Sequence, residues 1–338
     1  MDISRHQMDQ VGARSGTRSD FARWWWRSIN MIDAFEQVEI VQDLAVPRFG
    51  LGCAHIVREG EVEGGAAIVR EALDRGVNFF DTAPLYGRGE SELAVGLGLS
   101  GVPRDSFVLS TKVGRLIRDG EAQFDFSADG IRRSLDESLE RLQLDHIDIA
   151  LVHDPHKYYE QVLSGSVPVL EQWREQGIVK AIGVGIANNE MLMNFARNAS
   201  FDCFLLPSQY TLLEQPGNAL VDLCAEKGIT IIGAGVYNTG ILASDLQADA
   251  KYAYQKAPAA ILERAKGLKM VCQRHGVALS AAAIQFPFAH PAVKTVVIGA
   301  DQLGQVDANL SALKIDIPTA LWSDLKDEGL LDKKVPTL

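Results

Sequence analysis

The sequence predicts an α/β fold, namely a single-domain (β/α)8 TIM barrel. Eight short runs of apolar and β-branched residues alternate with longer amphipathic stretches. Nearly continuous apolar strands separated by helices indicate a parallel sheet that is covered on both faces. An open doubly wound sheet shows the same alternation, but no G-x-G-x-x-G motif follows the first strand, so we favour the barrel.

The expected elements follow this order along the chain. A small hairpin over 36–46 precedes the barrel and closes its floor. The eight expected strands cover 49–53, 77–80, 107–111, 147–152, 181–184, 203–206, 230–233 and 294–298. The expected helices cover 64–74, 91–99, 128–142, 167–176, 190–197, 219–227 and 258–275, and a further helix contains residues 305 and 309.

The spacing of apolar residues and the positions of glycines support the expected helices. In 128–142, the apolar residues Ile131, Leu135, Leu139 and Leu142 recur at helical spacing. Glycine stands where several helices are expected to end, and it favours the left-handed backbone that commonly terminates a helix. These glycines are Gly76, Gly177, Gly228 and Gly276.

The composition and net charge indicate a globular protein and exclude some kinds of partner. The chain has 338 residues, of which 47% are hydrophobic and 23% charged, so a large core is expected. The net charge of −11 argues against a nucleic-acid surface, and no apolar run reaches the length of a membrane helix. We expect a small-molecule substrate as the partner, and the sequence leaves the oligomeric state open.

The cysteines predict neither disulfides nor a metal site. They are widely spaced, with no CxxC pair and no histidine at metal-ligand spacing. We therefore expect reduced thiols, no metal and a cytoplasmic location. The four are Cys53, Cys203, Cys224 and Cys272.

Residues 1–30 differ from the rest of the chain. They are polar and arginine-rich, contain the triplet Trp24-Trp25-Trp26, and lack the apolar segment of a secretory signal. We expect a poorly ordered N-terminal extension, with a natural start at Met31 as an alternative. A membrane-surface or partner-binding role for the tryptophans is a third interpretation. Residues 31–338 are expected to form the barrel domain.

Four polar side chains follow three consecutive expected strands. Asp81 and Tyr86 come after the second strand, Lys112 after the third and His153 after the fourth. Function in such barrels sits at the C-terminal ends of the strands. Each residue could instead have a purely structural role. Asp81 could cap the following loop and Tyr86 could form a pocket wall. Lys112 could be a surface charge and His153 a hydrogen-bonded core histidine. Their occurrence at consecutive strand ends favours one shared site.

These residue types suit proton transfer beside a carbonyl or hydroxyl carbon. Tyrosine has an ordinary pKa near 10, and a close ammonium stabilises its phenolate. Lys112 is expected to lower the pKa of Tyr86, while Asp81 holds the lysine through an ion pair. His153 is expected to hydrogen-bond the substrate oxygen.

These segments resemble those of the aldo-keto reductases. The matching motifs are D-x-x-x-x-Y at 81–86, T-K-V-G at 111–114 and V-H-D-P at 152–155. The resemblance extends from about residue 49 to residue 330. It implies that Tyr86 is the general acid/base of a nicotinamide-dependent oxidoreductase, and that Asp81, Lys112 and His153 complete a catalytic tetrad.

Longer strings resemble one bacterial branch, that of the aldose 1-dehydrogenases and pyridoxal 4-dehydrogenase. This likeness implies oxidation of a cyclic hemiacetal to a lactone, with an aldose such as L-fucose, D-arabinose or L-galactose as substrate. Pyridoxal is the alternative substrate, and a nucleotide-binding regulatory subunit is a more distant alternative. The strings are FDFS at 124–127, FDCFLL at 201–206, YTLL at 210–213 and YNTGIL at 237–242.

Loops after the last two strands are expected to hold the cofactor. Glycines there permit close backbone approach to a pyrophosphate, and the helix start after the eighth strand suits an anion. With the tetrad carboxylate Asp81, the expected cofactor residues are Gly52, Gly185, Ser208, Gly235, Tyr237, Asn238, Gly240, Gly299, Ala300, Asp301, Gln305 and Asn309.

Asp301 favours NAD over NADP. The resemblance places Lys or Arg at this point in many relatives, where it binds the 2′-phosphate of NADP. A carboxylate repels that phosphate and accepts from a ribose hydroxyl. The structural alternative is that Asp301 caps the following helix.

Two features of many aldo-keto reductases are absent. A tyrosine that stacks on the nicotinamide is replaced by Ala234 or Gly235, and a Ser-Asn pair by Gly185-Ile186. The expected substrate residues are His55, Ile56, Tyr86 and His153, and the further pocket candidates are Arg115, Tyr158 and Trp173, although packing suits the helical Trp173 better.

Overall fold

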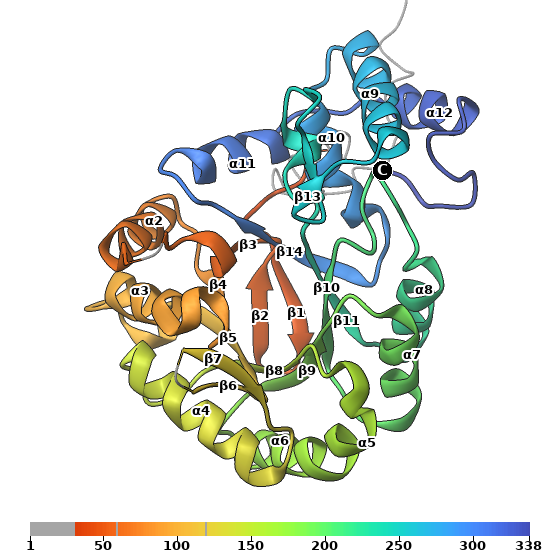
Figure 1. The fold of residues 1–338 in the computed structure, drawn as a ribbon. Helices are drawn as coiled ribbons and strands as arrows, with labels where there is room; N and C mark the ends of the chain where they lie inside the picture. The colour runs from red at the N-terminus through yellow and green to blue at the C-terminus, as the bar shows by residue number, and fades with distance from the viewer. Residues whose placement is uncertain (1–30, 59, 119) are drawn as a thin grey trace, which may run out of the picture.

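Eight parallel strands close into a barrel in the computed structural model, which describes residues 31–58, 60–118 and 120–338. The predicted (β/α)8 barrel is therefore confirmed (Figure 1). In chain order the strands are β3 (Phe49–Gly52), β4 (Phe79–Asp81), β5 (Val108–Val113), β8 (Ile149–His153), β9 (Ala181–Gly185), β10 (Cys203–Pro207), β11 (Thr230–Ala234) and β14 (Val293–Gly299). The expected extension over residues 1–30 lies outside the described residues.

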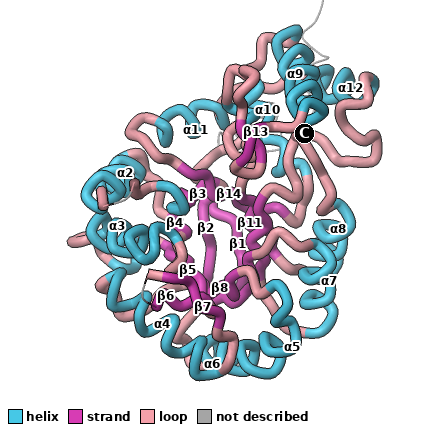
Figure 2. The backbone as a smooth tube through the Cα atoms, viewed as in Figure 1, coloured by secondary structure: helices cyan, strands magenta, loops and turns pink. Residues whose placement is uncertain are grey.

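Helices surround the barrel as an outer ring (Figure 2). They bury apolar faces against the strands, as in α4, where Ile131, Leu135 and Leu142 are buried. Within the described ranges, no helix is long and apolar enough to cross a membrane. The main helices are α2 (Val62–Asp74), α3 (Glu90–Leu99), α4 (Ala128–Leu142), α6 (Val167–Glu175), α7 (Asn189–Asn198), α8 (Asn218–Lys227), α9 (Ala259–Arg274), α10 (Leu279–Gln285), α11 (Gln305–Leu313) and α12 (Thr319–Asp327).

A hairpin closes one end of the barrel, as the sequence predicts. Strands β1 (Gln37–Val41) and β2 (Leu44–Pro47) pair antiparallel, and Figure 1 shows them across the middle of the barrel. Ile40, Leu44 and Val46 join the apolar cluster that includes Ile149 and Leu151. The hairpin therefore fills the barrel with side chains from below, which leaves the opposite end for a site.

Two further hairpins stand at the C-terminal ends of the strands. The pair β6 (Arg115–Arg118) and β7 (Glu121–Phe124) follows β5, and the pair β12 (Lys251–Tyr252) and β13 (Gln255–Lys256) lies between β11 and α9. The sequence analysis predicted neither hairpin. Both extend the rim around the site.

Gly114, at the end of β5, is expected to tolerate no side chain. Its φ is 91°, and a Cβ would lie 2.3 Å from the Phe126 ring. Left-handed backbone costs a non-glycine residue about 1–2 kcal/mol, and overpacking adds about 1–3 kcal/mol. Gly114→Ala should therefore lower the free energy of unfolding by about 2–5 kcal/mol, measured by urea denaturation.

Gly101→Ala is the matched control. Gly101 has a φ of 81°, but nothing lies within 4 Å of a Cβ built there. Only the backbone cost of about 1–2 kcal/mol should remain. Equal losses in the two variants would show that the Phe126 contact is unimportant.

Candidate active site

A buried ion pair joins the ends of two neighbouring strands. Strand β4 pairs with β5 so that Asp81 lies opposite Ser110, which brings the Asp81 and Lys112 side chains together. Lys112 Nζ lies 2.8 Å from Asp81 Oδ2 and donates to the Thr82 carbonyl at 2.8 Å. Asp81 and Lys112 are 3% and 1% exposed. The ammonium is therefore fixed in position inside the protein.

Tyr86 and His153 lie beside this pair. Tyr86 begins a 3-10 turn (Tyr86–Gly89) after β4, and Lys112 Nζ is 4.8 Å from the centroid of its ring. The rings of Tyr86 and His153 meet edge to face, with centroids 5.8 Å apart. The structure thus brings together all four residues that the sequence analysis assigned to one site.

The pKa of Tyr86 is higher than the sequence analysis predicts. Burial raises the pKa of the phenol above its ordinary value; Lys112 opposes this rise, and Asp81 adds to it. The expected effect of the lysine is present, but it does not outweigh burial. The phenol is therefore protonated at neutral pH in the protein without its ligands.

The pKa values of Lys112 and His153 are shifted in opposite directions. Burial alone disfavours the Lys112 ammonium, but Asp81 and Tyr86 together raise its pKa above the ordinary value. Burial lowers the pKa of His153 far below its usual range, and Lys112 and Arg115 act in the same direction. The site therefore holds a charged lysine next to a neutral histidine, whose Nδ1 is buried with no hydrogen-bond partner in the described structure.

The loop after β11 holds polar groups in strained conformations. Asn238 has a φ of 49° and is 2% exposed, yet neither its Oδ1 nor its Nδ2 has a hydrogen-bond partner in the described structure. Ser208, after β10, has a φ of 57° and donates to the Gly235 carbonyl. Gly235 has a φ of 60°, and a Cβ there would lie 2.5 Å from Ser208 Oγ, so a side chain at this position would strain the backbone and displace the serine hydroxyl. Gly240, at the far end of the loop, has a φ of 86°.

Two predicted cofactor residues contact each other. The Tyr237 hydroxyl donates to Asn309 Oδ1 at 2.9 Å, which joins the β11 loop to α11. Burial raises the pKa of Tyr237, so this phenol stays a donor. The pair fixes the loop against the helix.

The turn after β14 places Asp301 at the surface. Asp301 does not cap α11, because the residue at the cap is Gly304, whose φ is 87°. The Asp301 carboxylate instead accepts from Gln305 Nε2 at 2.8 Å, and the side-chain Oε1 of Gln305 accepts from the Asp301 backbone N–H at 2.8 Å. Ala300 is buried in the apolar core, whereas Gly299 is exposed.

Gly52 and Gly185 stand at the ends of strands β3 and β9. Gly52 pairs with Gly299 in the register of β3 and β14. A Cβ at Gly185 would lie 3.6 Å from Lys112 Cε, so this glycine borders the tetrad.

Of the other pocket candidates, three contact polar or aromatic side chains and the fourth packs in the core. His55 is exposed, and its Nε2 lies 3.4 Å from the hydroxyl of Tyr254, in the turn between β12 and β13. Arg115 pairs with Asp154 at 3.0 Å and lies over the Phe124 ring. Tyr158 stacks on the same ring. Trp173 is in the apolar core and does not reach the site.

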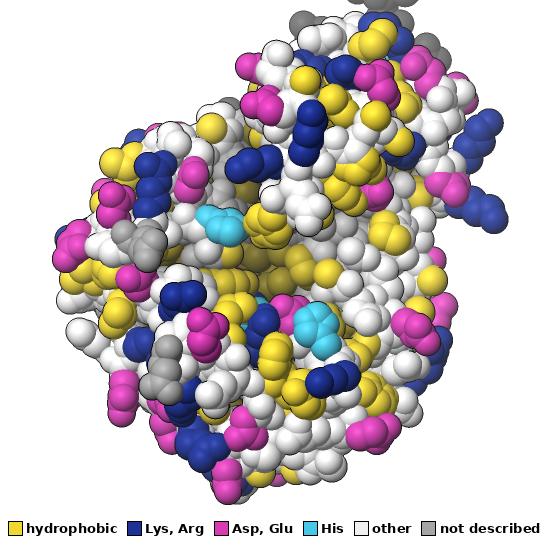
Figure 3. Space-filling view, viewed as in Figure 1, with side chains coloured by type: hydrophobic (Ala, Val, Ile, Leu, Met, Phe, Trp, Pro, Cys, Tyr) yellow, Lys and Arg dark blue, Asp and Glu magenta, His cyan; other side chains and the backbone are white. Residues whose placement is uncertain are grey.

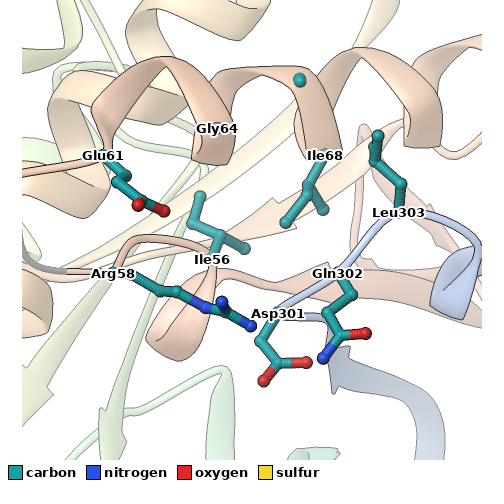
Figure 4. A pocket seen from close by; sticks show the side chains of 9 residues that line it. Ile56, Arg58, Glu61, Gly64, Ile68, Asp301, Gln302 and Leu303 are labelled. Carbon is teal, nitrogen blue, oxygen red and sulfur yellow. The ribbon is translucent and has the colours of Figure 1, made fainter.

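A cavity near Asp301 includes residues that the sequence analysis missed. It lies between the start of α2 and the turn after β14, as Figure 4 shows. The predicted residues Ile56 and Asp301 line it together with Arg58 and Gln302. Ser110, which donates to Asp81 Oδ1 at 2.5 Å, was also missed. Ser110 lies two residues before Lys112, and strand alternation could have placed it on the same face.

The face that carries these loops is hollowed over the barrel (Figure 3). Hydrophobic side chains gather in the hollow, and charged side chains surround it. This arrangement suits a small ligand with an apolar ring and polar substituents. In the described residues, no group of three or more His, Cys, Asp or Glu side chains is arranged to hold a metal ion.

The chain is similar to proteins of one known family. The model of the Aldo/keto reductase family matches residues 50–327. D-threo-aldose 1-dehydrogenase from a Pseudomonas species is 37% identical, over 85% of this chain and 95% of the relative. Pyridoxal 4-dehydrogenase from Microbacterium luteolum is 32% identical, over 85% and 95%.

A solved structure shares the fold. An aldo-keto reductase from Bacillus halodurans in its holo form superposes with a TM-score of 0.75 at 24% identity, covering 89% of this chain and 98% of that one. The family match covers most of the chain, and it agrees with the barrel and with the branch to which the sequence strings point. The chain therefore belongs to the aldo/keto reductase family of oxidoreductases.

Proposed function

We propose that the protein is an NAD-dependent dehydrogenase that oxidises the hemiacetal carbon of a small aldose to a lactone. The observation that carries this proposal is the placement of Tyr86 against the buried Lys112–Asp81 pair and beside His153. The 37% identity to D-threo-aldose 1-dehydrogenase supports an aldose as substrate.

Tyr86 acts as the general base in this direction. It accepts the proton of the anomeric hydroxyl, and the Lys112 ammonium stabilises the phenolate form against the effect of burial. His153 is held neutral, so it donates one hydrogen bond to the substrate oxygen without adding charge. Asp81 keeps Lys112 charged and positioned.

The residues present fit a nicotinamide dinucleotide. The unpartnered amide of Asn238 and the glycines Gly235 and Gly240 provide hydrogen bonds and open backbone for its phosphates. When bound, the nicotinamide accepts the hydride that leaves the substrate carbon. Gly185 borders the tetrad, and we assign Gly52 and Ser208 to the cofactor as the family resemblance implies. Asp301 at the surface favours NAD over NADP.

A second candidate substrate is pyridoxal. Its cyclic hemiacetal presents the same reacting group, and the 32% identity to pyridoxal 4-dehydrogenase supports it. Hydrophobic side chains gather in the hollow, which suits an apolar ring face. The two proposals differ in the substrate alone and share the roles of the tetrad.

A substrate panel tests the proposal. The protein is mixed with NAD and, separately, with L-fucose, D-arabinose, L-galactose or pyridoxal, and absorbance is followed at 340 nm. We expect the sugars to give the highest kcat/KM. Faster oxidation of pyridoxal would support the second candidate, and turnover of none of the four would contradict both.

A further inference from the structure

The Asp154 carboxylate lies beside the histidine of the tetrad. Asp154 directly follows β8, and its Oδ2 is 3.7 Å from His153 Nε2. The other ring nitrogen, His153 Nδ1, is buried with no hydrogen-bond partner in the described structure, so Nε2 is the nitrogen that a substrate oxygen can reach. The Asp154 side chain is 30% exposed and is therefore open to a ligand. A ligand that binds His153 Nε2 thus meets a carboxylate as well.

The backbone of Asp154 has an unfavourable conformation. Its φ is 43°, in the left-handed region that residues other than glycine rarely adopt. The Asp154 N–H donates to the carbonyl of Gly185, at the end of the neighbouring strand β9, at 2.9 Å. Strained backbone of this kind is concentrated at functional sites. The fixed turn keeps the carboxylate next to His153.

Arg115, on the hairpin β6–β7, holds this carboxylate. Its Nη1 donates to Asp154 Oδ2 at 3.0 Å, and its Cζ lies 4.7 Å from the centroid of the Phe124 ring, which pairs with Arg115 in the hairpin register. The Arg115 side chain is 15% exposed, so the guanidinium has little freedom to move. Among the described residues, no other hydrogen-bond donor reaches the Asp154 side chain. Oδ1 and part of Oδ2 therefore remain able to accept from a ligand.

The chemistry of an aldose decides which of its groups meets Asp154. In the proposed reaction the anomeric oxygen binds Tyr86 and His153 Nε2. The anomeric carbon has two neighbours in the ring, namely the ring oxygen and a carbon that carries a hydroxyl. A carboxylate accepts hydrogen bonds but donates none, so it repels the ring oxygen and binds the hydroxyl. Because Oδ2 lies only 3.7 Å from Nε2, the hydroxyl of the adjoining carbon is the one within reach.

We propose that Asp154 determines substrate specificity by accepting a hydrogen bond from the hydroxyl on C2, the carbon next to the anomeric carbon. Arg115 is the positioning residue that holds the carboxylate for this contact. The inference rests on the proposed function, since it assumes an aldose as substrate. It narrows the substrate class to aldoses with a free C2 hydroxyl, and it fixes which side of the sugar ring faces Asp154.

Three related sugars test this contact. The value of kcat/KM at saturating NAD is measured for L-galactose, for L-fucose, which lacks the C6 hydroxyl of L-galactose, and for 2-deoxy-L-fucose, which also lacks the C2 hydroxyl. Wild type should prefer L-fucose to 2-deoxy-L-fucose roughly tenfold to hundredfold, as expected for a hydrogen bond to a charged group. The ratio of L-galactose to L-fucose is the control, because the C6 hydroxyl is remote from the reacting carbon. That ratio should be the same in wild type and in the Asp154 variants.

Two substitutions of Asp154 separate the contact from the backbone. Asp154→Gly removes the carboxylate and suits the left-handed backbone, so it should nearly abolish the preference by lowering kcat/KM for L-fucose alone. Asp154→Asn keeps an acceptor oxygen without the charge and should retain a preference of roughly threefold to tenfold. Asparagine adopts left-handed backbone more readily than most residues, so this variant gives the same comparison if Asp154→Gly does not fold. Glu121→Gln removes an exposed carboxylate from the same rim hairpin and should keep the full preference.

The role of Arg115 is tested in the same assay. Arg115→Gln should weaken the preference for L-fucose, and its addition to Asp154→Gly should weaken it no further, because the arginine acts through the carboxylate. The inference is overturned if wild type does not prefer L-fucose to 2-deoxy-L-fucose. It is also overturned if the Asp154 variants slow both sugars equally, as a purely structural role would. Turnover of no aldose would instead contradict the proposed function, and this inference with it.

Discussion

Replacement of Tyr86 by phenylalanine is expected to reduce kcat at least about a hundredfold, because general acid–base catalysis contributes roughly 10²–10⁴-fold. The change removes the hydroxyl and keeps the ring, which meets His153 edge to face and lies near Lys112. The pocket should therefore keep its shape. Initial rates of NAD reduction, measured at 340 nm with the best substrate of the panel, provide the test.

Two controls separate loss of chemistry from loss of structure. Nucleotide affinity, measured by calorimetry, should be unchanged in Tyr86→Phe. Tyr159→Phe removes a hydroxyl that accepts from Asn198 on α7, and it should leave the rate near that of wild type. A Tyr86→Phe protein that retains most of its turnover would exclude the phenol from proton transfer.

Lys112→Met is expected to reduce both stability and activity. Asp81 would remain buried without its counter-charge, and breaking a buried pair in this way costs about 3–5 kcal/mol. The pKa of Tyr86 would rise further, since Lys112 is the group that opposes burial. Urea denaturation and initial rates measure the two effects.

The double variant Asp81→Asn/Lys112→Met distinguishes the two roles of the lysine. Removing both charges eliminates the unpaired carboxylate, so much of the lost free energy of unfolding should return. The rate should remain low, because no ammonium faces Tyr86. Recovery of the rate together with stability would show that Lys112 acts through structure alone.

Much of the barrel could be predicted because each strand is buried on both faces and bounded by glycine or polar residues. The observed Ala181–Gly185 and Cys203–Pro207 strands, for example, extend each expected range by one residue. The tetrad could be located for a related reason. The C-terminal ends of parallel strands meet at one end of the barrel, so Asp81, Lys112 and His153 are brought together by connectivity alone.

The features that were missed depend on packing between distant loops. The hairpins β6–β7 and β12–β13 have strands of only two to four residues, and β7 and β13 are mostly exposed, so they leave no clear alternation of apolar residues in the sequence. Arg58 lines a cavity with Asp301, which lies far along the chain, so the two could not be connected from the sequence. The pKa of Tyr86 was predicted in the wrong direction, because the spacing of charges indicates Lys112 but not the extent of burial.

The pH dependence of kcat/KM for oxidation tests the central claim most directly. Tyr86 must be deprotonated to act as a base, and its pKa in the free protein lies above the ordinary tyrosine value of about 10. Measured at saturating NAD, kcat/KM for the sugar reports the groups of the protein before the sugar binds, so it should rise from pH 7 towards pH 10. A profile that is flat across this range, or that levels off near pH 7 as a histidine would, would contradict Tyr86 as the proton acceptor.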